Sequence, residues 1–213
     1  MVTNTSPSAN STFVAQVYRD LLDRAVDPSG FATFTNALNQ GMTPNQVVLA
    51  IEGSTEYRTN LVESFYSQFL GRAADLTGLL GAVQFLGAGG TNEQLLSAIT
   101  GSQEYFQKTG ATTDGFLNAL YEDALGRAID PSGEAASTQA LAAGMSRVQV
   151  AATIFSSPEY QQKLVESYYQ RSLRRPGDPE GLAAWVESLQ RGSTDAQVLA
   201  GIVGSEEYLR RAP

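Results

Sequence analysis

One phrase occurs four times in this chain, and it constrains the fold more than any other feature. Its first copy reads Tyr18-Arg19-Asp20-Leu21-Leu22-Asp23-Arg24-Ala25-Val26-Asp27-Pro28-Ser29-Gly30, and the others span residues 66–78, 121–133 and 169–181. Self-similarity at a fixed period indicates an architecture in which each copy contributes one supersecondary unit. We therefore divide the chain into four units, named repeats 1 to 4 in chain order.

The spacing of the repeats predicts a domain organisation. The arginines of the phrase follow one another at intervals of 48, 55 and 48 residues. The seven extra residues of the middle interval lie near residues 108–115, where glycines and threonines interrupt the helical pattern. This indicates a flexible tail over residues 1–11, a domain of two repeats over 12–108, a linker over 109–115 and a second domain of two repeats over 116–213.

Each repeat predicts three helices and no strand, so the expected fold class is all-α, with two tandem helical bundles. Phe13, Val17 and Leu21 recur at helical spacing in the first helix of repeat 1. An aspartate, followed by proline in three repeats, is typical of the start of a second helix. A Ser or Thr with Gln three residues later forms a capping box before the third helix. The Ser-x-Glu-Tyr phrase then opens a helix that we expect to continue into the next repeat, over about 56–71 and 159–173.

Composition excludes several classes of function. The net charge is −8 with only two lysines, Lys108 and Lys163, so we expect no nucleic-acid partner, which would need clustered positive charge. No apolar run approaches the length of a membrane span, and the first residues lack the features of a secretory signal. Cysteine and histidine are absent, which removes thiolate chemistry, the commonest general base and the commonest transition-metal ligand. We expect no cofactor, no metal site and no catalysis.

The repeated phrases resemble a known bacterial family. Leu125-Gly126-Arg127-Ala128-Ile129-Asp130-Pro131-Ser132-Gly133, together with the later Trp185 and Ser205-Glu206-Glu207-Tyr208, resembles the DUF4214 domain. The resemblance covers residues 13–208. It implies an accessory module of secreted or surface-associated bacterial proteins, some of which carry calcium-binding repeats or carbohydrate-active modules. A more distant similarity, to the helical domain of phycobilisome linker polypeptides, extends to helical architecture.

The sequence departs from the family pattern in two places. Repeats 1 and 4 lack the glycine of the Leu-Gly-Arg phrase, since Asp23 and Arg174 stand there. The tryptophan position holds Phe34 in repeat 1, while repeats 2 and 3 have alanine and serine.

The arginine and aspartate of each phrase are the first candidate site residues. They are three residues apart in all four repeats: Arg24 and Asp27, Arg72 and Asp75, Arg127 and Asp130, Arg175 and Asp178. As a functional hypothesis, each arginine is a fork that binds a carboxylate, phosphate or sugar. As a structural hypothesis, each arginine ties the following turn or a Ser-x-Glu-Tyr carboxylate. Fourfold repetition favours the structural interpretation, because repeats reuse residues that form the fold.

A second set, Trp185, Phe34, Arg174 and Arg175, could contact a ligand. The aromatic rings could stack on sugars and the arginines could meet an acidic polymer, although core packing and a solvated mixed-charge face are the competing interpretations. The acidic turns offer too few oxygens for calcium. The prediction is therefore a non-catalytic interaction module, secreted or at the bacterial surface, that contacts another protein or its own chain. A carbohydrate-binding module, a calcium-dependent assembly module and a carboxylate enzyme are the alternatives.

Overall fold

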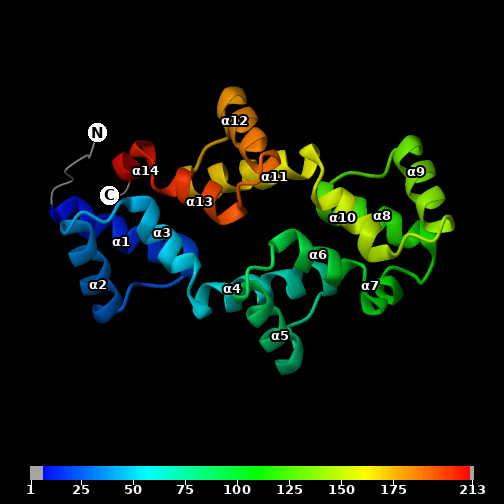
Figure 1. The fold of residues 1–213 in the computed structure, drawn as a ribbon, viewed down its shortest axis with the longest axis horizontal. Helices are drawn as coiled ribbons and strands as arrows, with labels where there is room; N and C mark the ends of the chain where they lie inside the picture. The colour runs from blue at the N-terminus through cyan, green and yellow to red at the C-terminus, as the bar shows by residue number, and fades with distance from the viewer. Residues whose placement is uncertain (1–6, 212–213) are drawn as a thin grey trace. The chain divides into compact units, whose positions relative to one another are not determined.

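The computed structural model describes residues 7–211, and every regular element in that range is helical, as the repeats predict. Repeat 1 and the passage to repeat 2 contain α1 (Pro7–Leu22), α2 (Pro28–Asn39), α3 (Pro44–Glu52), α4 (Thr55–Phe65) and the π-helix η1 (Tyr66–Leu70). The next elements are α5 (Leu76–Gly87), α6 (Asn92–Thr100), α7 (Gln103–Lys108), α8 (Thr113–Leu125), α9 (Pro131–Ala142) and α10 (Arg147–Phe155). The chain ends with α11 (Pro158–Tyr168), the π-helix η2 (Tyr169–Leu173), α12 (Pro179–Gln190), α13 (Asp195–Val203) and α14 (Glu206–Arg211) (Figure 1).

The helix starts follow the predicted caps. The carboxylates of Asp27, Asp75, Asp130 and Asp178 accept backbone N–H groups at the starts of α2, α5, α9 and α12. All four capping boxes also form, at α3, α6, α10 and α13. These contacts satisfy N–H groups that a helix start leaves without a partner, so local sequence determines where these helices begin.

The turn after the first helix of each repeat requires a left-handed residue. Gly71 and Gly126 adopt φ values of 70° and 63° there, and Asp23 and Arg174 adopt 54° and 53° at the equivalent positions of repeats 1 and 4. A left-handed conformation costs a non-glycine residue about 1–2 kcal/mol. The two departures from the Leu-Gly-Arg phrase therefore keep the turn at an energetic cost.

The predicted continuous helices are confirmed. α4 passes directly into η1, and α11 passes into η2. The π-helical segments therefore end the first helices of repeats 2 and 4. The first helices of repeats 1 and 3, α1 and α8, end as ordinary α-helices.

The described chain forms two compact units, and their composition differs from the predicted domains. Unit 1 combines Met1–Tyr57 with Leu164–Pro213, and unit 2 is Arg58–Lys163. Repeat 1 therefore shares a core with repeat 4, and repeat 2 shares one with repeat 3. The predicted division into residues 12–108 and 116–213 is not the one observed.

The connections between repeats differ along the chain. Between repeats 1 and 2, α4 continues into η1 without a turn. Between repeats 2 and 3, in contrast, α7 ends at Lys108, a turn follows, and Thr112 caps α8. The predicted linker is thus a tight turn that lets α6 pack on α10. Of the predicted flexible tail, residues 7–11 belong to α1, and residues 1–6 lie outside the described range.

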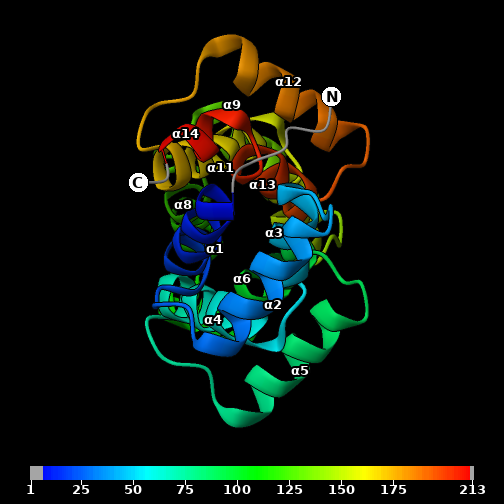
Figure 2. The same cartoon turned by 90° about the vertical axis from the view of Figure 1, so that its left-hand side faces the viewer.

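Each unit is built around one pair of third helices. In unit 1, α3 packs on α13 (Figures 1 and 2). The Phe13 ring meets the Tyr208 ring edge-on, with centroids 5.9 Å apart. In unit 2, α6 packs on α10, and Phe69 meets Phe155 edge-on at 6.0 Å. The two units thus repeat one architecture, with a core shared between two repeats.

Candidate functional site

The repeated arginine lies at the centre of a polar cluster that we call the clasp. In repeat 3, Arg127 donates from Nε and Nη2 to the two oxygens of Glu159, at 2.5 and 2.8 Å. Its Nη1 donates to the Ala128 carbonyl and to Asp130, at 3.1 and 3.2 Å. The guanidinium also lies over the Tyr121 ring, 5.3 Å from its centroid. Four of the five N–H groups of Arg127 are therefore engaged within the chain.

The clasp recurs in every repeat. The same bidentate pairs join Arg24 to Glu56, Arg72 to Glu104 and Arg175 to Glu207, in each case with the guanidinium over the tyrosine of the phrase. The glutamate is that of the Ser-x-Glu-Tyr phrase, so each clasp ties the start of a repeat to its end. This is the contact that the structural hypothesis predicted.

The clasps shift the pKa values of their carboxyls. Hydrogen bonds from Ser132 and the Gly133 N–H hold the pKa of Asp130 well below its ordinary value. The bidentate bond from Arg127 lowers the pKa of Glu159. Both carboxyls therefore stay ionised at neutral pH, which suits a structural ion pair and not a proton donor.

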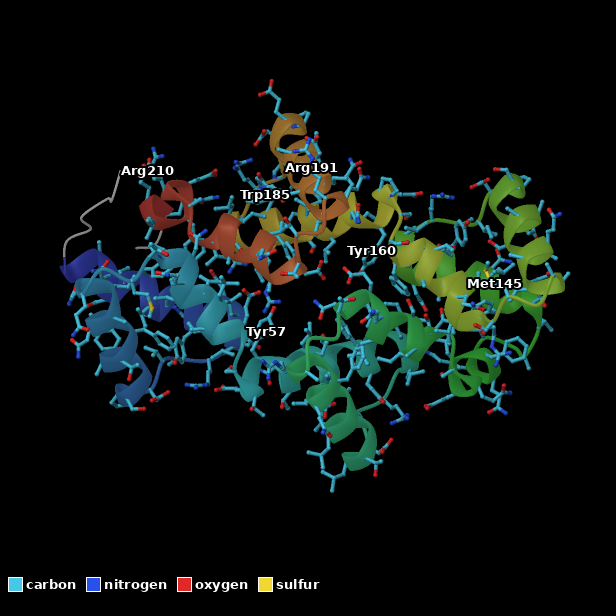
Figure 3. All side chains as sticks on the ribbon, viewed as in Figure 1. Tyr57, Met145, Tyr160, Trp185, Arg191 and Arg210 are labelled. Atoms are coloured by element: carbon cyan, nitrogen blue, oxygen red, sulfur yellow. The ribbon has the colours of Figure 1, made fainter. Side chains whose placement is uncertain are left out.

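The predicted ligand residues have separate partners within unit 1. Trp185 on α12 packs against Gly201 on α13, where an added Cβ would clash with the indole ring (Figure 3). Phe34 packs against Tyr18, with centroids 6.2 Å apart. Both rings are half-buried at the edge of the core, as the packing interpretation expects.

The two arginines of this set are engaged in ion pairs. Arg175 is the clasp arginine of repeat 4 and binds Glu207. Arg174 donates to Asp20 at 2.9 Å, and the Tyr208 hydroxyl donates to the other oxygen of Asp20 at 2.7 Å. Asp20 is buried, and its carboxylate joins repeat 1 to Arg174 and Tyr208 of repeat 4. The predicted carbohydrate contacts have no further support from this geometry.

Sequence reasoning missed a buried carboxyl in unit 1. Glu52, the last residue of α3, is 6% exposed, and its Oε2 atom has no hydrogen-bond partner among the described residues. Burial, reinforced by the negative charge of Asp195 on α13, raises the pKa of Glu52 to about 9. Burial likewise raises the pKa of Tyr57, which faces Glu52, Asp195 and Arg171. Glu52 is therefore protonated at neutral pH.

A break in the repeat could have revealed this site. The positions equivalent to Glu52 hold Thr100, Phe155 and Val203, all buried. A carboxyl at such a core position breaks the local pattern, which is expected at strained or functional sites. Because it is so deeply buried, Glu52 is suited to control stability rather than to meet a substrate. Among the described residues, no group of three or more acidic or metal-ligating side chains could hold a metal ion.

An apolar helix face in unit 2 is the second feature that departs from the repeats. Leu76 and Leu80 on α5 are 72% and 59% exposed. In the second helices of the other three repeats, the position of Leu76 holds proline. The position of Leu80 holds Ala32, Ala135 and Ala183. With Val83 and Gly87 they form one line along α5 at spacings of four, three and four residues, which we call the α5 seam. This spacing is that of a helix that packs along another helix.

Comparison with known proteins identifies one family model, described as a domain of unknown function, DUF4214. It matches residues 3–61, 96–164 and 160–212. Residues 62–95, which include α5, lie outside the matched ranges. No curated protein and no solved structure matches the chain significantly. In the described part of the chain, no helix combines the length and the apolar character that crossing a bilayer demands.

Proposed function

The chain belongs to the DUF4214 family, and on that premise we propose that it is a non-catalytic helical module that binds another protein chain. The α5 seam carries the proposal. Leucines exposed by 72% and 59% at adjacent turns are costly to leave in water, and contiguous exposed apolar side chains mark interaction surfaces.

The polar groups of the repeats support a scaffold role. The clasp arginines engage carboxylates of their own repeats, and the clasp carboxyls have lowered pKa values. Acid–base catalysis at neutral pH needs a group whose pKa lies near 7, which these carboxyls lack. Glu52, whose pKa is raised to about 9, is buried.

We place the module outside the cell or at the bacterial surface, as the family resemblance implies. Carbohydrate binding through Trp185 is the alternative, and it rests on the half-exposed ring alone. Protease treatment of intact cells of the source organism tests the location: a surface protein is degraded, and an internal one is protected.

Site-specific photo-cross-linking tests the interaction. A photoreactive phenylalanine analogue replaces Leu80, and in a matched variant it replaces Ala183, the exposed equivalent on α12. We expect irradiation in source-cell material to yield a protein adduct from position 80 and none from position 183. Equal yields at both positions, or no adduct at position 80, would refute the proposal.

A further inference from the structure

We propose that the protein self-associates, with the α5 seam of one copy packing antiparallel on the α5 seam of a second copy. This inference rests on the proposed function and names its partner. It starts from three properties of α5: exposed leucines, absence of charge and a self-complementary order of side chains.

The absence of charge selects a partner. No ionisable residue occurs from Leu76 to Asn92, although the chain as a whole carries a net charge of −8. Two copies of an acidic protein repel one another over most surfaces. At α5 they can meet without bringing carboxylates together.

The order of side chains fits antiparallel pairing. A twofold axis at the middle of the seam places position 76 of one copy opposite position 87 of the other, and position 80 opposite position 83. Leu76 then lies opposite Gly87, over which Arg58 extends, and Leu80 lies opposite Val83, whose side chain also packs against the core of unit 2. A larger side chain thus meets a smaller one at both pairs. An isologous interface of this kind makes every contact twice.

The ends of the seam have opposite charge. Asp75, which precedes Leu76, is 61% exposed at its side chain. Arg58 of α4 lies against Gly87 at the other end, with Nη1 3.1 Å from the position of an added Cβ. Antiparallel pairing brings Asp75 of each copy toward Arg58 of the other. Parallel pairing would set each charge beside its like.

The size of the seam sets the expected affinity. α5 has 12 residues, which span about 18 Å at 1.5 Å per residue. One such helix on each side buries less than the roughly 1,200 Å² typical of stable complexes. We therefore expect a dissociation constant in the range of roughly 1 μM to 1 mM.

Sedimentation equilibrium of the purified chain from roughly 1 μM to 1 mM tests the inference across that range. The wild type should move from monomer to dimer. The double variant Leu76→Pro with Leu80→Ala gives α5 the residues of the other second helices, so it should keep its helical circular dichroism. We expect it to weaken the dimer by at least about tenfold, because it removes the two most exposed leucines. The single variant Leu80→Ala should also weaken the dimer, and it introduces no proline into the backbone of α5.

A control variant trims apolar side chains elsewhere in unit 2. Met145 follows α9 (Figure 3) and Val148 lies on α10. They are 39% and 40% exposed, and their replacement by alanine should leave the dimer unchanged. A wild type that stays monomeric, or a Leu80→Ala variant that dimerises as well as the wild type, overturns the inference. If the wild type is monomeric while position 80 cross-links to a different protein, self-association fails and the proposed function stands.

Discussion

Removing the buried carboxyl of Glu52 should make unit 1 more stable, and the gain should grow with pH. The ordinary pKa of a glutamate is 4.5, and in the folded chain that of Glu52 is raised to about 9. A raised carboxyl pKa means that the folded state binds the proton more tightly than the unfolded state. The associated stability is full below pH 4.5 and is lost as the pH rises through 9.

The magnitude follows from the pKa difference. Each pH unit between 4.5 and 9 lowers the free energy of unfolding by about 1.4 kcal/mol, so the whole interval is worth up to about 6 kcal/mol. Native proteins have a total stability of about 5–15 kcal/mol. A loss of this size would therefore be a large part of the stability of unit 1.

The assay is urea unfolding of the wild type and Glu52→Gln at pH 5, 7 and 9. Trp185 is the only tryptophan of the chain and lies in unit 1, so its fluorescence reports on that unit. The variant keeps the size of the side chain and removes its titration. We expect its advantage over the wild type to increase by up to about 1.4 kcal/mol per pH unit.

Glu180→Gln is the control, since Glu180 is exposed on α12 and should leave the pH dependence as in the wild type. The clasp carboxyls have lowered pKa values, so protonating them at low pH lowers the free energy of unfolding. This contribution is the same in the wild type and both variants, so it cancels when their stabilities are compared. An advantage of Glu52→Gln that stays constant from pH 5 to pH 9 would refute the reasoning.

Three further substitutions test the packing of the repeats. Gly133→Ala would bring a Cβ to 2.7 Å from the Tyr121 hydroxyl and should destabilise unit 2 by about 1–3 kcal/mol. Gly81→Ala places its methyl group in open space and should stabilise unit 2 by about 0.5–1 kcal/mol. Calorimetry should therefore show melting temperatures that shift in opposite directions in the two variants. Tyr208→Phe removes the hydrogen bond to the buried Asp20 and should lower the free energy of unfolding of unit 1 by about 1–3 kcal/mol. Urea unfolding followed by Trp185 fluorescence measures this change. An unchanged unfolding midpoint would show that the bond contributes nothing to stability.

Local sequence was sufficient for the helices. The aspartate caps, the four capping boxes and the continuous passage from α4 into η1 were all predicted, because each depends on residues within one or two turns of one another. The clasp was predicted in outline for a different reason. Its residues recur in register in every repeat, so the partner of each arginine could be narrowed to two repeated carboxylates.

The candidate sites required the third dimension. Glu52 looks like an ordinary helix-end glutamate until packing of α3 on α13 removes it from water and brings Asp195 near. Leu76 and Leu80 look like core residues of an apolar helix until the fold leaves them exposed. In both cases the exposure of the side chain defines the candidate site. That exposure depends on which helices pack together in the folded chain.

The sequence by itself determined that this chain is a fourfold helical repeat and where its helices begin, and it offered the following turn or a Ser-x-Glu-Tyr carboxylate as the partner of each arginine. Only the tertiary structure decided that repeat 1 shares a core with repeat 4 and repeat 2 with repeat 3. The physical reason is that helix starts are set by short-range contacts, which are the same in every copy. The repeats have similar apolar faces, so those faces alone do not specify a partner. The connections differ along the chain: α4 runs into η1 between repeats 1 and 2 and α11 runs into η2 between repeats 3 and 4, whereas a turn joins α7 to α8 between repeats 2 and 3.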